Sequence, residues 1–299
     1  MKNYVLYNPL SGNNIGKQGA EKLCEIYDKD TLDFINICEI SDYEKFFSSL
    51  SSEDDIIICG GDGTLNRFVN DTDGVEYSNK IFFYAMGTGN DFLRDIGKDK
   101  GSEPFCVDEY IKDLPSVTVN GKTSKFLNNV GFGIDGYCCE VGDKLREENK
   151  KDINYTSIAI KGLLFHYHPT NATVIVDGEE YNYKKVWIAP TMNGRYYGGG
   201  MMPTPDQDRL GADKSVSLML FYGSGKIKTL MAFPSLFEGK LLEHTDITKV
   251  HVGHNITVKF DRPTALQIDG ETVKGVTEYS VESAAVRIKR EESTEKAAL

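Results

Sequence analysis

Three apolar runs in the first 95 residues each end in a glycine-rich loop that leads into a helix-like pattern. The junctions read VLYNPLSG (5–12), IIICGGDGTLNRF (56–68) and IFFYAMGTGNDFL (81–93). In an open α/β sheet, the loops that leave the strand ends line one crevice, and ligands bind there. A helix N-terminus suits phosphate because it offers unpaired N–H groups and a partial positive charge. The repeated junction therefore predicts a nucleotide site.

The chain divides into two halves of different pattern. The first alternates expected strands with helix-like stretches, which predicts βαβ units and a mostly parallel sheet; the strands lie at 4–7, 35–40, 56–59 and 81–86, and the helices at 17–28, 42–50 and 64–70. From about residue 115, strands are joined by Asn-Gly, Asp-Gly or Pro turns, with helix-like interruptions at 137–165 and 226–239. Such turns are typical of antiparallel hairpins. We expect an α/β domain at 1–116, an all-β, sandwich-like domain at 117–290 and a tail at 291–299 that can pack back on the first domain.

Composition excludes several classes of protein. A net charge of −11 argues against a nucleic-acid partner and against general adsorption to an anionic membrane, although a local patch could still adsorb. The six cysteines form no C-x-x-C pair, so we expect buried free thiols in a reducing cytosol. The N-terminal apolar run is too short for a signal peptide, and no stretch is long enough to span a bilayer. The expected location is cytoplasmic, at most peripheral to a membrane.

The loop Gly60-Gly61-Asp62-Gly63-Thr64 is the sharpest motif. Glycines allow a backbone to approach a phosphate closely or to take a positive φ. A carboxylate at Asp62 would repel a bare phosphate, so it implies Mg²⁺ or a proton to accept. Thr64 is a candidate cap for the helix at 64–70. The alternative is a tight strand–helix turn with an Asx-type cap, and the two companion loops favour the nucleotide interpretation.

Those companion loops are individually weaker. Gly87-Thr88-Gly89-Asn90-Asp91 repeats the design, although Asn90 and Asp91 are also good cap residues. Asn8-Pro9-Leu10-Ser11-Gly12 completes the set. The following Gly12-to-Lys17 stretch fails as a P-loop because it has three intervening residues instead of four and Gln18 in place of Ser or Thr. No G-x-G-x-x-G fingerprint follows a strand, so the chain is neither a Walker ATPase nor an ordinary Rossmann dehydrogenase.

Together these motifs resemble the diacylglycerol kinase catalytic domain family, which comprises bacterial lipid kinases related to sphingosine, ceramide and, more distantly, NAD kinases. The resemblance rests on N-P-x-S-G (8–12), G-G-D-G-T (60–64) and G-T-G-N-D (87–91), and on Gln267-Ile-Asp-Gly-Glu271 near the C-terminus. Gly131-Phe-Gly-Ile-Asp135 and Gly198-Gly-Gly-Met201 also match. It covers essentially the whole chain.

The resemblance implies an ATP-dependent lipid kinase that transfers the γ-phosphoryl group of Mg-ATP to a hydroxyl of a diacylglycerol-like lipid. Asp62 would orient the metal and phosphates, Glu271 would be the general base, and Asp135 would assist it. From the residues alone, Glu271 is more typical of a solvated strand residue after a turn, whereas a carboxylate at Asp135, in a strand that otherwise appears buried, needs a partner or a cleft. The implied nucleotide contacts are Asn8, Pro9, Leu10, Ser11, Gly12, Gly60, Gly61, Asp62, Gly63, Thr64, Leu65, Asn66, Gly87, Thr88, Gly89, Asn90 and Asp91.

The resemblance also implies a structural Mg²⁺ site in the β-rich half. Asp213 is the best match for its aspartate, with the carbonyls of Leu210 and Ser215. Lys214 stands where the family usually has glycine, and an ammonium there would compete with a cation. A surface turn rich in Asp and Lys, without a metal, is an equally good interpretation of these residues.

The expected partner is a lipid presented at a membrane, which the protein would contact transiently. Whether the chain forms a homodimer is left open. The apolar segment at 163–168, with Tyr155 and Ile158, favours a helix packed on the sandwich over a lipid contact. Other functions open on this fold are an NAD kinase, a sphingoid kinase and a catalytically silent nucleotide-binding regulator.

Overall fold

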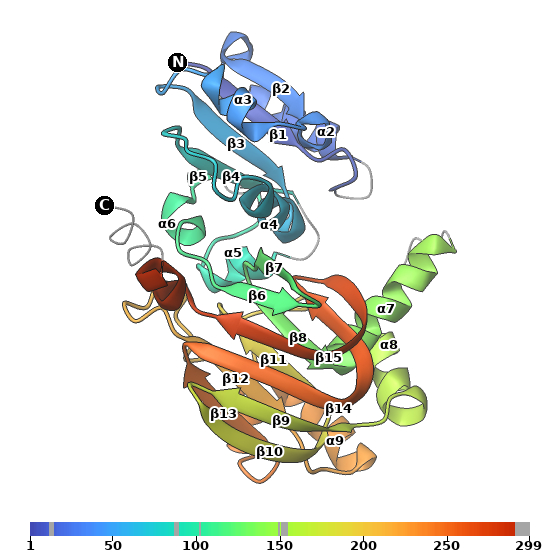
Figure 1. Cartoon of the computed structure of the whole chain (residues 1–299). Coiled ribbons are helices and arrows are strands. Elements are labelled where there is room, and N and C mark those ends of the chain that lie inside the picture. Colours follow the sequence, from blue (N-terminus) through green and yellow to red (C-terminus); the bar gives the residue numbers. More distant parts are fainter. Residues whose placement is uncertain (12–14, 87–89, 102, 149, 151–154, 291–299) are drawn as a thin grey trace. The chain divides into compact units, whose positions relative to one another are not determined.

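The computed structural model describes residues 1–11, 15–86, 90–101, 103–148, 150 and 155–290 (Figure 1). The chain divides into two compact units, Met1–Asp113 and Leu114–Leu299. Each of the two hydrogen-bonded sheets lies within one unit. The predictions made for Gly12, for residues 87–89 and for the tail at 291–299 lie outside the described residues.

The first unit is built on a five-stranded sheet of order β2-β1-β3-β4-β5. The first four strands pair in parallel and β5 is antiparallel. Parallel strands covered on both faces are apolar along their length, and β3, with the sequence DIIICG, is buried at all but its first residue. The strands are β1 (Asn3–Tyr7), β2 (Leu32–Asn36), β3 (Asp55–Gly60), β4 (Ile81–Ala85) and β5 (Phe105–Cys106). The α/β class predicted for this half is confirmed.

Short helices connect these strands. The α-helices are α2 (Gly16–Ala20), α3 (Tyr43–Ser48), α4 (Asp62–Asp71), α5 (Asp91–Asp95) and α6 (Asp108–Ile111), and the 3₁₀ turns are η1 (Glu21–Glu25), η2 (Lys29–Thr31) and η3 (Ile37–Glu39). Helix α4 buries Leu65, Phe68 and Val69, the stripe that its sequence spacing predicts.

Two boundaries predicted for this half are wrong. The strand expected at 35–40 instead ends at Asn36, because the Asn36 side chain accepts a hydrogen bond from Cys38 N at 3.0 Å and turns the chain into η3. The helix expected at 17–28 is the short α2 followed by the tighter turn of η1. A side chain–backbone bond such as the one at Asn36 competes with regular structure, even where the apolar pattern favours a longer strand.

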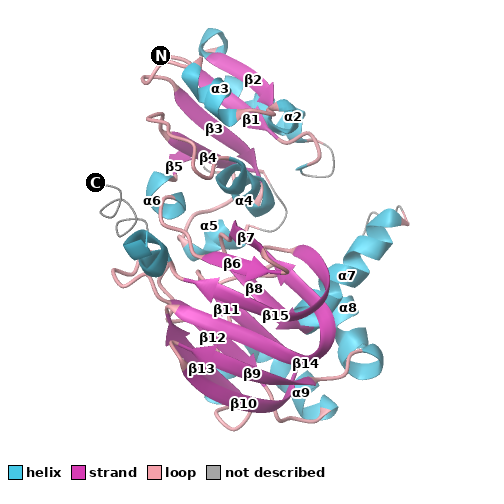
Figure 2. Ribbon diagram, in the orientation of Figure 1, coloured by secondary structure: helices cyan, strands magenta, loops and turns pink. Residues whose placement is uncertain are grey.

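The second unit is a ten-stranded sheet folded into a sandwich (Figure 2). The strand order is β13-β12-β11-β8-β14-β15-β6-β7, and the β9–β10 pair joins at β14. The strands are β6 (Ser116–Val119), β7 (Lys122–Lys125), β8 (Asn129–Gly133), β9 (Thr170–Val176), β10 (Glu179–Val186), β11 (Ile188–Met192), β12 (Val216–Phe221), β13 (Thr248–Gly253), β14 (Asn255–Ile268) and β15 (Glu271–Glu282). The sandwich-like class expected for this half is confirmed.

Two apolar clusters hold this unit together. One fills the inside of the sandwich and includes Phe132, Val258 and Tyr279. The other packs a layer of helices against β11 and β12, through residues such as Leu163, Trp187 and Phe233. The elements of this layer are α7 (Ile134–Glu147), α8 (Tyr155–Lys161), the π-helix η4 (Gly162–His166), α9 (Lys226–Ala232), η5 (Phe233–Leu236) and η6 (Leu241–Glu243). Residues 284–290 are also helical.

The glycines of the Gly131-Phe-Gly133 motif let β8 lie against β11. A Cβ on Gly131 would lie 2.6 Å from Pro190 Cα, and one on Gly133 would lie 2.4 Å from Trp187 O. Gly133 also has a φ of +127°, a value that side chains disfavour. The strand ends there, so Asp135 lies in the first turn of α7 and the expectation that it belongs to a strand is wrong.

None of the helices in the described ranges has the length and apolarity needed to cross a bilayer.

Candidate active-site residues

In the first unit, hydrogen bonds tie together the loops that follow β1, β3 and β4. Asn8 Nδ2 donates to Thr64 Oγ1 at 3.5 Å, which joins the first loop to the second. Phe92 N donates to Asp62 Oδ2 at 3.0 Å, which joins the second loop to α5 after β4. Met86 N also donates to Gly60 O at 2.8 Å. The three strand ends thus form one connected surface at the carboxyl edge of the sheet.

The first loop is held in shape by its own residues. Leu10 N donates to Asn8 Oδ1 at 3.0 Å, an Asx turn, and Ser11 Oγ donates to Asn8 O at 2.8 Å. Gly16 lies against the same carbonyl, since a Cβ there would be 1.9 Å from Asn8 O. Leu10 itself is exposed. The Asn-Pro-Leu-Ser segment is therefore a fixed turn and not a loose connection.

The glycines of the Gly-Gly-Asp-Gly loop serve different purposes. A Cβ on Gly60 would lie 2.3 Å from Thr64 Oγ1, so this glycine makes room for the neighbouring threonine. A Cβ on Gly63 would have no heavy atom within 4 Å, and Gly63 is exposed. Gly63 lies in the first turn of α4, where backbone N–H groups lack helical partners. It leaves bare backbone at a helix N-terminus, a position that suits an anion such as phosphate.

The residues after Asp62 have structural roles that the sequence analysis misplaced. Helix α4 begins at Asp62 with Gly61 as its N-cap, so Thr64 lies inside the helix and is not its cap. Leu65 is fully buried and its N–H donates to Gly61 O. Asn90 is the N-cap of α5 without a side-chain cap bond, and Asp62 accepts the Phe92 N–H there instead. Asp62 thus links its own loop to the start of α5 by a hydrogen bond.

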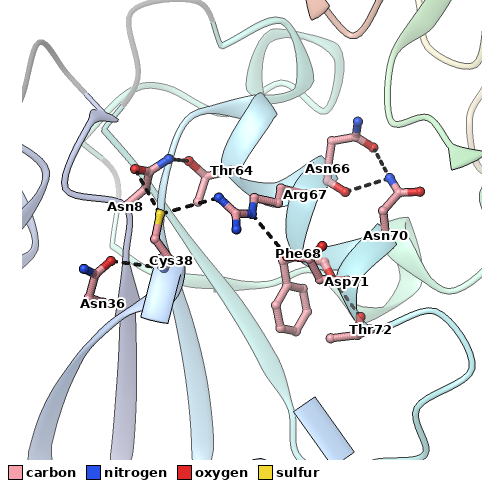
Figure 3. A network of polar contacts seen from close by, with 10 residues as sticks. All are labelled: Asn8, Asn36, Cys38, Thr64, Asn66, Arg67, Phe68, Asn70, Asp71 and Thr72. Carbon is pink, nitrogen blue, oxygen red and sulfur yellow. Dashed lines mark hydrogen bonds and ion pairs between the residues drawn. The ribbon is translucent and has the colours of Figure 1, made fainter. Parts of the chain in front are cut away.

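A polar network extends from these loops along α4 (Figure 3). Arg67 Nε donates to Asp71 Oδ2 at 3.1 Å, Arg67 Nη1 donates to Cys38 Sγ at 3.5 Å, and Cys38 Sγ lies 4.0 Å from Asn8 Oδ1. Asn70 Nδ2 donates to the backbone and side-chain oxygens of Asn66. All six cysteines are free thiols, as expected, but the prediction that they are buried is wrong for Cys38 and Cys106.

In the second unit, Asp135 is a buried carboxyl group with an unmatched oxygen. Its side chain is 6 % exposed; Oδ1 accepts a hydrogen bond from Gly136 N at 2.9 Å, and Oδ2 has no partner among the described residues. Burial raises the Asp135 pKa from its ordinary 3.8 to about 7, although the Gly136 N–H and the nearby Gln267 amide act to lower it. The two side chains do not form a hydrogen bond: Gln267 Nε2, like Asp135 Oδ2, has no partner in the described part of the chain. A carboxyl group with this pKa exchanges protons near neutral pH.

The Gln-Ile-Asp-Gly-Glu motif forms the turn between β14 and β15. Gly270 N donates to Gln267 Oε1 at 2.9 Å, and Asp269 and Gly270 have φ values of +46° and +88°. The Asp269 carboxylate accepts N–H groups from Leu127, Asn128 and Asn129 at 2.6, 2.8 and 3.0 Å. Burial raises the Asp269 pKa to about 6, although these three donors lower it. Glu271 is exposed at the start of β15.

Further buried side chains fix the segment that Asp269 holds. Arg209 Nη1 donates to Leu127 O at 3.3 Å, and its Nη2 donates to Asn128 Oδ1 at 3.0 Å. Asn193 Nδ2 donates to Leu127 O at 2.9 Å. The Asp269 carboxylate and the Arg209 guanidinium thus bind the same three-residue segment, and Arg209 lowers the Asp269 pKa. This clamp fixes the start of β8, the strand that leads to Asp135.

The predicted metal site at Leu210, Asp213 and Ser215 is an exposed turn. Ser215 N donates to Asp213 Oδ1 at 3.4 Å, and Gln207 Nε2 donates to Ser215 O at 3.0 Å. Lys214 has a φ of +53°, a conformation that suits the glycine usual in the family. The described residues contain no cluster of three or more acidic, histidine or cysteine side chains suited to a metal. Of the three predicted positions, Asp213 alone carries a carboxylate, and this group already bonds within its own turn, so Mg²⁺ binding here stays a prediction.

Both units match models of known families. Residues 2–116 match the diacylglycerol kinase catalytic domain, and residues 128–289 match the YegS C-terminal NAD kinase beta sandwich-like domain. The chain belongs to the diacylglycerol kinase catalytic domain family.

Individual members of this kinase family are distant relatives. A diacylglycerol kinase of Mycobacterium tuberculosis is 23 % identical over 87 % of this chain and 84 % of its own length. A diacylglycerol kinase of Bacillus subtilis is 21 % identical over 89 % of this chain and 88 % of its own length. The crystal structure of a diacylglycerol kinase from Bacillus anthracis matches 95 % of both chains with a TM-score of 0.62 and 21 % identity. That likeness establishes the fold.

Gln267, Asp269 and Arg209 belong to the candidate site by their hydrogen bonds, and the sequence alone does not single them out. The first two stand in the Gln-Ile-Asp-Gly-Glu motif, in which the family resemblance gives a role only to the last residue, Glu271. A turn aspartate followed by glycine is usual in hairpins, so only the three distant N–H groups reveal that Asp269 holds another segment. Arg209 lies in a turn-rich stretch without a motif, and no local signal could have found it.

Proposed function

We propose that the protein is an ATP-dependent lipid kinase that transfers the γ-phosphoryl group of ATP, together with Mg²⁺, to a hydroxyl of a diacylglycerol-like lipid. The observation that carries the proposal is the set of three strand-end loops, bonded to one another around the open backbone at Gly63. Membership of the kinase family gives this arrangement a specific chemistry.

The nucleotide would lie on the loops of the first unit. The N-terminus of α4, left bare at Gly63, would receive phosphate oxygens, and the fixed turn at Asn8–Ser11 would line the same edge. Thr64 and Leu65 would act mainly by holding this surface in shape. Gly12, Gly87, Thr88 and Gly89 stay proposed contacts, together with Pro9, Asn66 and Asp91.

Mg²⁺ would enter with the nucleotide. Mg²⁺ that accompanies a nucleotide needs only one or two protein carboxylates, because phosphates and water fill the other positions. Asp62 fits this limited role, since it lies at the N-terminus of α4 with its Oδ2 fixed by Phe92 N. The metal would supply charge neutralisation at the transferred phosphoryl group.

We assign the proton-accepting role on the acceptor side to Asp135 ahead of Glu271. A general base works best when its pKa is near the working pH. Burial gives Asp135 a pKa of about 7 and leaves its Oδ2 without a partner among the described residues. A lipid hydroxyl could donate to that oxygen, and the Gln267 amide could bind a second polar atom of the acceptor. Glu271, exposed at the turn, stays the alternative base.

The enzyme would act in the cytoplasm, with peripheral contact to the membrane that carries its lipid. The test is incubation with labelled ATP, Mg²⁺ and separate acceptors: diacylglycerol, sphingosine, ceramide and NAD. We expect label on diacylglycerol, and roughly 100-fold less with Asp135→Asn purified in parallel, which excludes a contaminating kinase. Label on NAD alone would contradict the assignment to lipid, and nucleotide binding without any labelled acceptor would indicate a silent regulator.

A further inference from the structure

Four buried side-chain atoms near the start of β8 and the β14–β15 hairpin have no hydrogen-bond partner among the described residues. They are Asp135 Oδ2, Gln267 Nε2, Asn129 Nδ2 and Thr272 Oγ1. Asn129 and Gln267 are each only 2 % exposed. Buried donors in native proteins nearly always have a partner, which can be protein, ligand or water. Two buried amides that both lack a protein partner therefore point to a bound group.

Strand pairing puts three of these side chains on the same face of the sheet. Gln267 lies opposite Gly131 of β8 and opposite Thr272 of β15. Asn129 is two residues from Gly131 and therefore faces the same way. The residue between them, Val130, belongs to the sandwich core on the other face. The two amides are thus diagonal neighbours across a position, Gly131, that carries no side chain.

The first turn of α7 brings Asp135 to the same face. Its carboxyl group is close enough to the Gln267 amide for the amide to act on its pKa. Helix α7 also begins against β14, because a Cβ on Gly136 would lie 2.2 Å from Ala265 O, two residues before Gln267. A carboxyl group, two amides and a hydroxyl are therefore gathered in one buried part of the second unit.

The donors in this group suit a ligand oxygen with free lone pairs. An amide NH₂ group donates and does not accept, and the oxygens Gln267 Oε1 and Asp135 Oδ1 are already bonded to backbone N–H groups. An ammonium group, which only donates, would leave both amides unpaired, and an ether oxygen is a weak acceptor. A carbonyl oxygen has two lone pairs and can accept from two N–H groups.

We infer that the Gln267 and Asn129 amides bind the carbonyl oxygen of an acyl group attached next to the accepting hydroxyl of the lipid, with Thr272 as a further donor. The inference rests on the proposed function, in which that hydroxyl donates to Asp135. A site whose buried donors match a substrate group rejects analogues that lack the group, because the donors are then left unpaired. Such a carbonyl occurs as an ester in diacylglycerol and as an amide in ceramide.

The test compares acceptors that differ in this carbonyl. Dioctanoylglycerol has ester carbonyls, and dioctylglycerol, the matching diether, has none. Short-chain ceramide and sphingosine form a second pair, in which the carbonyl is an amide. All four are dispersed in detergent, and kcat/KM with Mg-ATP is measured for each.

The variants remove donors without adding bulk. Asn129→Leu replaces the amide by an apolar group of similar size, and Thr272→Val removes the hydroxyl. Thr191→Val is the matched control, since the Thr191 hydroxyl is also buried but bonds to Tyr279 of the sandwich core. Thermal unfolding checks each fold. Asn129→Leu should melt no lower than the native protein, because it removes an unpaired buried donor.

We expect the native protein to prefer dioctanoylglycerol over the diether by roughly 100-fold in kcat/KM. Asn129→Leu should lose about tenfold on dioctanoylglycerol and nothing on the diether. Thr272→Val should show a smaller loss of the same kind, and Thr191→Val should keep the native preference. Equal use of the two acceptors by the native protein would overturn the inference. So would an equal loss on both in Asn129→Leu, because the amide would then only support the fold.

The same assay separates this inference from the proposed function. If dioctanoylglycerol and the diether are labelled equally, the kinase stands and only the carbonyl subsite fails. If ceramide is labelled in place of dioctanoylglycerol and Asn129→Leu reduces that labelling, the subsite stands and the proposed acceptor is wrong. If none of the acceptors is labelled, both fail.

Discussion

The strand-end loops of the first unit and the Asp135–hairpin region of the second unit use polar residues in opposite ways. In the loops, Asn8, Asp62 and Thr64 bond to neighbouring loops and leave glycine backbone exposed. In the second unit, Asp135 and Gln267 are buried, and each keeps a polar atom without a partner in the described residues.

This difference matches two chemical tasks. Phosphate binding needs donors held in place, and backbone N–H groups can supply them once side chains have fixed the loop. Proton transfer needs a group whose charged state is costly, which burial provides. A fully bonded network makes the loops rigid, whereas burial makes the charged form of a carboxyl group costly and so raises its pKa. The predictions below test this division, from the largest expected effect to the smallest.

Asp135→Asn should lower kcat by roughly 10² or more, the usual weight of a general base. Asn keeps the size of the side chain but cannot accept a proton. ATP affinity should change little, because the residue is proposed to act on the acceptor. Steady-state kinetics with a fixed lipid acceptor measures both quantities.

Glu271→Gln is the matched comparison for that experiment. If Glu271 is the base, Glu271→Gln should lower kcat by roughly 10², and Asp135→Asn should keep most of the native turnover. That result would reverse the assignment and would place the reactive group on the exposed turn.

The same Asp135→Asn variant should be more stable than the native protein above neutral pH. Because the Asp135 pKa is raised from 3.8 to about 7, the folded state holds its proton more tightly than the unfolded chain. Its contribution to stability is therefore fully present below about pH 4 and is lost as pH rises to about 7. The whole window is worth at most about 4 kcal/mol, of which roughly 2.6 kcal/mol is lost between pH 5 and pH 8. Urea unfolding of both proteins at pH 5 and pH 8 measures it; a gain that does not grow with pH would contradict the buried-carboxyl account.

Asp269→Asn should destabilise the protein by about 2–3 kcal/mol, because an amide replaces one of the two oxygens that accept three buried N–H groups. Asp177 is a matched control: it also precedes a turn glycine, has a φ of +49° and accepts N–H groups from His254 and Asn255, but it is exposed. Asp177→Asn should cost less than about 1 kcal/mol, since water can replace its bonds. Equal losses in urea unfolding would show that burial of Asp269 has no special effect.

Gly63→Ala should weaken ATP binding about tenfold while leaving the fold intact. A Cβ there meets no protein atom within 4 Å, and alanine favours a helix by up to about 1 kcal/mol over glycine. Any loss of affinity would therefore come from the space left for the ligand. Gly225→Ala, at an equally open glycine before α9, is the control. Calorimetric titration with Mg-ATP measures the affinity, and native affinity in Gly63→Ala would place the phosphates elsewhere.

Lys214→Gly should give the smallest change, a stabilisation of about 1 kcal/mol or less. Lys214 has a φ of +53°, which glycine adopts without strain. The same variant sharpens the metal question, because it removes an ammonium beside Asp213. Thermal unfolding with and without Mg²⁺ measures both effects. A Mg²⁺-dependent rise in Tm that appears only in Lys214→Gly would indicate that the lysine replaces the cation.

The sequence by itself determined the fold class of each half and the edge of the first sheet where the loops gather. Those inferences depend on local information: apolar runs, their spacing and the glycines that follow them. Local information failed where a single side chain competed with the pattern, as at Asn36, which ends β2 early, and at Gly61, which takes the cap position expected for Thr64. The catalytic and binding roles proposed for these residues stay predictions.

Only the tertiary structure decided which carboxylates are buried and what they hold. Asp269 meets Leu127–Asn129 across about 140 residues of sequence, and Arg209 reaches the same segment from a turn without a motif. Asp135 acquires its raised pKa because Gly136 lets α7 lie against β14, where a Cβ would be 2.2 Å from Ala265 O. A pKa and a buried hydrogen bond depend on how much water the surrounding segments exclude. Those segments are distant in the chain, so their arrangement cannot be inferred from the residues beside the carboxylate.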